Sequence, residues 1–169
     1  MARNLPAITD DDIPEATSSF HDMILRASAR INDREKLAEY TKAHGTDRPF
    51  LTIEDERDLT RAAVARFDVD FDSARWLTSG ILMENGVALE RDLDKKIEHL
   101  VRRFAKTGKR ITRQEFKDAV ATYRSWAQNA VSESEVQKKL KSIIEDEGYR
   151  VGRSGIFRTK RWFNKIPSD

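Results

Sequence analysis

The sequence contains no cysteine, only seven glycines and four prolines, and no long apolar run. The absence of cysteine excludes disulfide bonds, thiolate metal sites and a cysteine nucleophile, and it fits a reducing compartment. No stretch approaches the roughly 20 apolar residues that span a bilayer, and the first residues form no hydrophobic signal core. We therefore expect a cytoplasmic protein that makes no contact with a membrane.

Residue patterns for catalysis and cofactor binding are also scarce. The histidines His21, His44 and His99 stand alone, without the His-x-x-His or Glu-x-x-His spacing of zinc sites. The two glycines near residue 153 lack the preceding strand and the Lys-Ser/Thr ending of a nucleotide-binding loop. We therefore expect no enzymatic activity and no cofactor.

Three aspartates, Asp68, Asp70 and Asp72, have the one-three-five spacing that opens a calcium-binding EF-hand loop. The later loop positions do not match, because Ser73 stands where the loop needs glycine and Ser79 where it needs a bidentate glutamate. The alternative is a solvated acidic turn in which Asp72 or Ser73 caps the next helix. The spacing leaves calcium binding open, and we name no metal ligand.

Charge is unevenly divided along the chain. Residues 1–84 hold 11 Lys and Arg against 17 Asp and Glu, whereas residues 85–169 hold 20 against 12. The two parts therefore carry formal charges of −6 and +8 within a total of +2. An acidic half suits solvent or a basic partner, and a basic half suits contact with phosphates. Chance variation along a charge-rich helical chain is the alternative explanation.

Apolar residues at three- and four-residue spacing predict a mainly α fold. Two capping boxes, Thr52 with Asp55 and Thr112 with an acidic residue three positions on, mark helix starts, and Gly148 marks a helix end. At helical spacing, Phe116, Tyr123 and Trp126 are expected in the core. The predicted helices cover residues 14–31, 33–43, 52–67, 73–85, 87–104, 112–127 and 134–147, with turns at Gly45-Thr46-Asp47-Arg48-Pro49 and Lys106-Thr107-Gly108-Lys109.

We expect three regions along the chain. Residues 1–12 form a flexible leader, and residues 13–85 form an acidic, bundle-like helical region. Residues 86–169 form a basic helical region whose last part is a winged-helix-like unit ending in a short basic β-hairpin.

The segment of residues 148–165 contains six cations, four aromatic residues and no carboxylate. Its β-forming residues predict a short hairpin over residues 149–163. Such a surface suits phosphates, which cations neutralise and hydroxyl groups bind as donors. The predicted nucleic-acid-binding residues are Arg150, Arg153, Ser154, Arg158, Lys160, Arg161 and Lys165. Phe157 and Trp162 are predicted to contact a protein partner or to stack on bases.

Three short motifs occur in the last third of the chain. They are a helix with Tyr123-x-x-Trp126, a Ser-capped helix ending in Leu140, and Gly148-Tyr149 followed by Arg153-Ser154-Gly155 and an aromatic close at Trp162. Together they resemble the C-terminal winged-helix module of phage and plasmid primase-helicases. The primase active site and the Walker helicase core of that family are missing. The resemblance therefore implies a stand-alone DNA-binding protein, encoded by a phage, a plasmid or another mobile element.

These patterns predict a non-enzymatic DNA-binding accessory or regulatory protein. In a winged helix one helix enters the major groove and the ribbon lies along a neighbouring groove or the backbone. The alternative is a small helical adaptor or structural subunit, whose basic aromatic tail docks a protein partner in a larger assembly.

Overall fold

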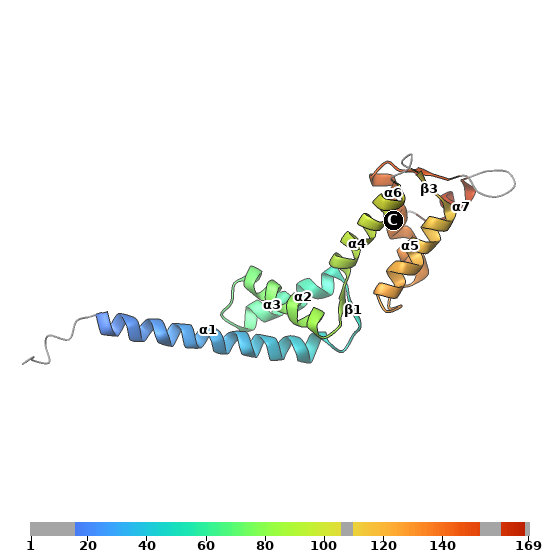
Figure 1. Cartoon of the computed structure of the whole chain (residues 1–169). Helices are drawn as coiled ribbons and strands as arrows, with labels where there is room; N and C mark the ends of the chain where they lie inside the picture. The colour runs from blue at the N-terminus through green and yellow to red at the C-terminus, as the bar shows by residue number, and fades with distance from the viewer. Residues whose placement is uncertain (1–15, 106–109, 153–159, 168–169) are drawn as a thin grey trace, which may run out of the picture.

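The computed structural model describes residues 16–105, 110–152 and 160–167, and it confirms a mainly helical fold (Figure 1). None of the helices in these ranges is long and apolar enough to cross a membrane. The helices are α1 (Ala16–Gly45), α2 (Ile53–Arg66), α3 (Phe71–Glu84), α4 (Glu90–Phe104), α5 (Arg113–Trp126), α6 (Glu133–Asp146) and α7 (Arg161–Asn164). The strands are β1 (Phe50–Leu51), β2 (Ala88–Leu89), β3 (Arg110–Ile111) and β4 (Arg150–Val151).

Helix α1 is one continuous helix of 30 residues, where we expected two. The predicted break before Asp33 is wrong because no proline or glycine interrupts the segment, and Asp33 lies 3.9 Å from Lys36 one turn later in the same helix. A helix of this length is about 45 Å long. Its first half extends beyond the other helices in Figure 1.

The chain contains the same supersecondary unit twice. In the first repeat, residues 50–89, β1 is followed by α2, α3 and β2; in the second repeat, residues 110–151, β3 is followed by α5, α6 and β4. Each of these four helices has 14 residues. In each repeat the two strands pair in parallel, with Phe50 opposite Ala88 and Arg110 opposite Arg150. Helix α4 runs from the first repeat to the second (Figure 1).

Local signals start the first helix of each repeat in the same way. The Thr52 hydroxyl accepts the N–H of Asp55, and the Asp55 carboxylate accepts the N–H of Thr52 at 3.1 Å. Thr112 and Glu115 repeat this arrangement at the start of α5. Both predicted capping boxes are confirmed, because a capping box depends only on residues three positions apart.

The second helix of each repeat is also capped at both ends. Ser132 caps α6, where its hydroxyl accepts the N–H of Glu135. For α3 the cap is Asp70, which accepts the Ser73 N–H at 2.9 Å, so the predicted caps Asp72 and Ser73 are wrong. The helix starts two residues earlier than expected, at Phe71. The glycines that follow the two helices, Gly86 and Gly148, adopt φ of 77° and 65°, which confirms them as helix ends.

Buried positions correspond between the repeats, whereas the residues that fill them differ. In the first helices, Glu56, Thr60 and Ala63 are equivalent to Phe116, Val120 and Tyr123. In the second helices, Ala74, Thr78, Ser79 and Leu82 are equivalent to Val136, Leu140, Lys141 and Ile144. Except at Leu82 and Ile144, the second repeat thus places larger and mostly apolar side chains where the first repeat has small or polar ones.

The hydrophobic core differs between the two repeats in the same way as these buried residues. The second repeat, α4 and α7 share one continuous cluster of 16 buried residues, which includes the predicted core residues Phe116 and Tyr123, with Trp126 packed against it. The first repeat has two small clusters, one around Leu51 and Leu82 and one around Leu37 and Ala63. The large core therefore belongs to the second repeat.

Helix α4 begins at Glu90 and not at Val87, because Ala88 and Leu89 pair with β1. The helix has one buried apolar face, with Leu93, Ile97 and Val101. The predicted turn at residues 106–109 and the predicted leader, residues 1–12, lie outside the described residues.

The hairpin predicted over residues 149–163 is wrong at its two described ends. Val151 lies opposite Ile111 in β3, which supplies the backbone partner that a second hairpin strand would have given. The other end forms the short helix α7, because Phe163 and Ile166 turn into the core. Residues 153–159, between these ends, lie outside the described residues.

Candidate nucleic-acid interface

Two arginines lie side by side on the strand pair of the second repeat. Arg110 of β3 and Arg150 of β4 are register partners and both are exposed, whereas the next residues, Ile111 and Val151, are buried. Successive side chains of a strand point to opposite faces, and paired strands lie about 4.8 Å apart. The two guanidinium groups therefore leave the strand pair on the same outer side.

Gly152 lies close to the backbone of β3 and to the Arg110 side chain. A Cβ atom at residue 152 would lie 3.2 Å from the Ile111 carbonyl oxygen and 3.5 Å from Nε of Arg110. The Gly152 N–H donates to that carbonyl at 2.6 Å, and its own carbonyl accepts Nε1 of Trp162 at 3.1 Å. Glycine at this position therefore lets the chain pass close to β3 and beneath the Arg110 side chain.

Helix α7 brings three further cations to the same end of the molecule. Lys160, Arg161 and Lys165 are exposed, whereas Phe163 is buried against α5. The ring of Trp162 lies edge-on to Phe116 with 5.3 Å between the ring centroids. The core contacts therefore hold α7 beside the first turn of α5 and next to β4.

We give the name basic end to the exposed cations of the strand pair β3–β4, of the start of α5 and of α7 with its two flanking residues. It includes the first residue of α5, Arg113, which directly follows the strand pair and is exposed. No cation of the basic end forms an ion pair with another residue in the described ranges. The basic end consists of Arg110, Arg113, Arg150, Lys160, Arg161 and Lys165.

Four of the predicted nucleic-acid-binding residues belong to the basic end: Arg150, Lys160, Arg161 and Lys165. The predicted residues Arg153, Ser154, Arg158 and Phe157 lie outside the described residues. Trp162 is partly buried and packs against Phe116 and Phe163. Sequence reasoning missed Arg110 and Arg113. A signal existed, because Arg110-Ile111 and Arg150-Val151 are the same pair of residue types, each in a short extended segment after a helix.

The first repeat has no equivalent of this surface. Phe50, Ile53 and Ala88 occupy the positions of Arg110, Arg113 and Arg150. The same parallel strand pair therefore forms without any arginine. The cations of the basic end are not needed to build the repeat, which makes binding the better explanation of their presence.

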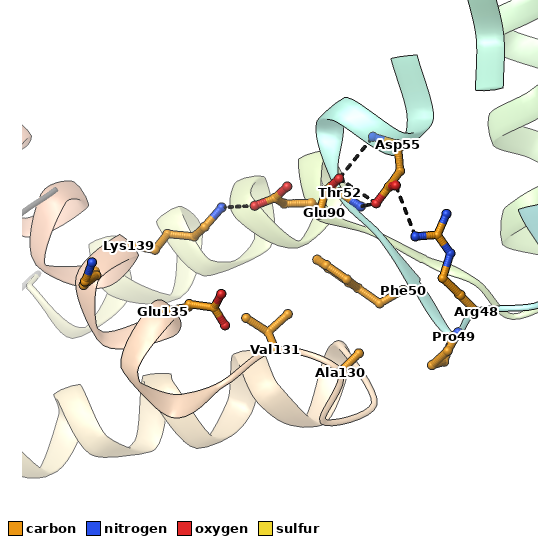
Figure 2. Close-up of a pocket in the computed structure, with 11 residues that line it drawn as sticks. Arg48, Pro49, Phe50, Thr52, Asp55, Glu90, Ala130, Val131, Glu135 and Lys139 are labelled. Atoms are coloured by element: carbon orange, nitrogen blue, oxygen red, sulfur yellow. Dashed lines mark hydrogen bonds and ion pairs between the residues drawn. The ribbon is translucent and has the colours of Figure 1, made fainter. Parts of the chain in front are cut away.

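A second concave region lies between the two repeats, and Figure 2 shows the residues around it. This cleft has a volume of about 570 Å³ and is lined by β1, the start of α2 and the start of α6. Its charged groups already have partners: Arg48 lies 3.1 Å from Asp55, and Lys139 lies 2.6 Å from Glu90. Its remaining lining is apolar, including Phe50, Pro49, Ala130 and Val131. The cleft is therefore a poor match for phosphates.

One polar network connects α4 to the second repeat beside this cleft. Nζ of Lys139 donates to Asp94 at 2.8 Å, and the Tyr123 hydroxyl donates to Asp94 at 2.9 Å. Burial, together with the charges of Asp94 and Glu90, raises the pKa of Tyr123 far above its usual value. Burial alone would lower the pKa of Lys139, but its hydrogen bonds to Asp94 and Glu90 outweigh this effect and raise it. The network thus fixes α4 to α5 and α6 of the second repeat, with Lys139 charged.

One of the three spaced aspartates serves a structural role. Asp70 caps α3, and the Ser73 side chain and N–H lower the pKa of Asp70. Within these ranges no three His, Cys, Asp or Glu side chains lie together in a way that could hold a metal ion. The capping role of Asp70 therefore explains the presence of an aspartate at one of the three spaced positions.

Comparisons with protein-family models, with curated proteins and with solved structures give no match to this chain. The geometry of the basic end is therefore the basis on which a function can be argued.

Proposed function

We propose that this protein binds nucleic acid, duplex DNA in the first place, through phosphate contacts made by the basic end. The observation that carries the proposal is the exposed pair Arg110 and Arg150, at positions where the first repeat has Phe50 and Ala88. Arginine binds phosphate with a planar fork of donors, so two adjacent guanidinium groups suit one phosphodiester or two successive ones. The protein acts in this proposal as an accessory or regulatory factor without catalysis.

The contacts we propose position the protein on the backbone and do not select a base sequence. Helix α6, which a winged-helix arrangement would place in the major groove, begins with Glu133 and Glu135. These carboxylates would oppose the approach of phosphates to its first turn. We therefore propose that the strand pair and α7, and not the start of α6, face the nucleic acid.

The test is a salt titration of binding by the full chain, measured by fluorescence anisotropy with duplex and single-stranded probes. Binding through phosphates should weaken with salt, with a log–log slope of about −0.9 per neutralised phosphate on duplex DNA. The full chain is needed, because removing residues after Gly148 would take Val151, Phe163 and Ile166 out of the core. A folded chain that fails to bind at low salt would sink the proposal and favour the adaptor alternative.

A further inference from the structure

The likeness between the repeats extends to the helix before each strand pair. Helix α4 precedes β3 as the second half of α1 precedes β1, and the first residues of these strands, Phe50 and Arg110, are 60 positions apart. The buried residues of α1 and of α4 with its C-cap correspond at the same offset: Leu37 with Ile97, Thr41 with Val101, and Gly45 with Ala105. Equivalent positions of the two helices therefore face the core, and equivalent positions face outward.

The outward side of α4 is basic. Lys95, His99 and Arg103 follow one another at four-residue spacing, and all three are exposed. A helix turns by about 100° per residue, so these side chains lie opposite to the buried residues of α4. Two further exposed cations flank them, and we name the whole set the α4 ridge: Lys95, Lys96, His99, Arg102 and Arg103.

The equivalent side of α1 is not basic. Its exposed residues at the positions of Lys95, His99 and Arg103 are Glu35, Glu39 and Ala43. The other two positions hold a cation in both helices. The α4 ridge thus has four Lys or Arg and no carboxylate, where α1 has two lysines and two glutamates. A basic outward side is therefore not needed by a helix at this place in the repeat.

The carboxylates of α4 leave the ridge unneutralised. Three of them form ion pairs: Glu90 and Asp94 with Lys139, and Asp92 with Arg91. Within the part of the chain that the structure describes, Lys95, Lys96 and Arg103 form no ion pair, and neither does the exposed Glu98. Exposed cations without carboxylate partners attract a polyanion.

The α4 ridge adjoins the basic end at Arg102. Nη2 of Arg102 lies 3.6 Å from Oε1 of Glu147, the residue that ends α6. Arg150 of β4 follows Glu147 by three residues, and β3 with Arg110 is the next described element after α4. The contact between Arg102 and Glu147 therefore places the last turn of α4 beside the strand pair, with Glu147 at the junction of the two basic surfaces.

From these observations we propose that the nucleic-acid interface continues from the basic end along the α4 ridge, so that duplex DNA contacts both the strand pair and the outward side of α4. The inference rests on the proposed function and adds a second contact site to it. From Lys95 to Arg103 the helix rises about 12 Å. This length corresponds to roughly three to four steps of about 3.4 Å along one strand of the duplex. The ridge contacts phosphates and selects no base sequence.

The first test removes two ridge cations from the full chain. Lys95→Ala with Arg103→Ala should weaken duplex binding and reduce the salt slope by about 2, at about 1 per cation. The control Arg57→Ala with Arg61→Ala loses two exposed cations of the first repeat and should bind like the wild type. Alanine favours the helix at these exposed positions, and circular dichroism checks that each variant keeps its helices.

The outcomes separate this inference from the proposed function. A ridge variant with the wild-type slope, beside an Arg110→Ala with Arg150→Ala variant whose slope is reduced, would overturn the ridge contact and leave the proposed function standing. A folded wild-type chain that binds no duplex at low salt would overturn both. Equal losses in the ridge variant and its control would also overturn the ridge contact, because they would indicate an effect of net charge alone.

The second test measures how close α4 lies to the bound duplex. The chain has no cysteine, so one introduced cysteine can carry an iron chelate that cleaves nearby DNA. His99→Cys and Glu39→Cys place this chelate at equivalent exposed positions of α4 and α1. We expect cleavage of a bound duplex from residue 99 and little from residue 39. Equal cleavage from both, or none from residue 99 while the duplex stays bound, would contradict the ridge contact.

Discussion

The two repeats have the same succession of elements and opposite distributions of polarity. The second repeat buries Phe116, Tyr123 and Leu140 in one continuous core. The first repeat buries Glu56 and Thr78 at two of the equivalent positions, and its apolar clusters are small. The capping boxes, the strand pairing and the helix-ending glycines are common to both. The comparison indicates that these local devices specify the backbone, whereas the core residues set how stable each repeat is.

On the surface, the first repeat is the more apolar of the two and the second repeat is the more charged. The first repeat exposes Trp76 and Met83, where the second exposes charged residues, and the second repeat exposes Arg110 and Arg150, where the first has Phe50 and Ala88. Neither set is needed to build the repeat, because the other repeat forms without it. The molecule thus contains two units of one architecture, with exposed apolar side chains on the first and exposed arginines on the strand pair of the second.

Core substitutions should affect the two repeats unequally, and this is the largest effect we expect. Leu140→Ala should destabilise the protein by about 3–5 kcal/mol, because it opens a cavity in the continuous core. Thr78→Ala at the equivalent position should cost about 1 kcal/mol or less, since the buried Thr78 hydroxyl has no hydrogen-bond partner among the residues that the structure describes. Urea denaturation followed by circular dichroism measures both. Equal losses would mean that the two cores contribute alike.

The buried carboxylate of the first repeat depends on Arg91. Glu56 is 4% exposed and accepts Nη1 of Arg91 at 3.0 Å and the Ser79 hydroxyl at 2.9 Å. Arg91→Ala should cost roughly 2–3 kcal/mol, at the low end for a broken buried pair because Arg75 remains 3.9 Å from Glu56. Urea denaturation measures the loss. The double change Glu56→Leu with Arg91→Leu should recover most of it, and a double variant as unstable as Arg91→Ala would contradict this account.

The cap of α2 should make a small, pH-dependent contribution to the stability of the fold. The Thr52 hydroxyl and N–H, with Arg48 nearby, lower the pKa of Asp55 below its usual 3.8. A carboxylate whose pKa is lowered by folding stabilises the fold above the unfolded pKa, and this contribution is lost as the pH falls through the folded pKa. In Asp55→Asn the side chain does not titrate, so the urea midpoint should fall less between pH 6 and pH 3 than in the wild type. An equal fall would assign the acid sensitivity to other carboxylates.

Local features of this fold could be predicted from the sequence, and contacts between distant segments could not. The capping boxes at Thr52 and Thr112 depend on residues within one turn of one another, and they are confirmed. The parallel strand pairs have two residues each and join segments far apart in the chain, so no local pattern marks them.

The structural repeat was not predicted from the sequence, because equivalent positions share a role and not a residue type. Glu56 and Phe116 are both buried at the same point of the repeat, yet no similarity of sequence connects them. For the basic end, composition located the cations of the tail, including Arg150. It did not locate Arg110 or Arg113, because only the pairing of β3 with β4 brings them beside that tail.

The central claim is that the basic end of the second repeat binds phosphates, and a charge-matched comparison tests it most directly. The variant Arg110→Ala with Arg150→Ala loses two exposed cations from the second repeat. Its control, Arg57→Ala with Arg61→Ala, loses two exposed cations from the first repeat. We expect weaker duplex binding and a salt slope reduced by about 2 in the first variant, at about 1 per cation, with the control close to wild type. Equal losses in both variants, or no loss in the first, would contradict the claim.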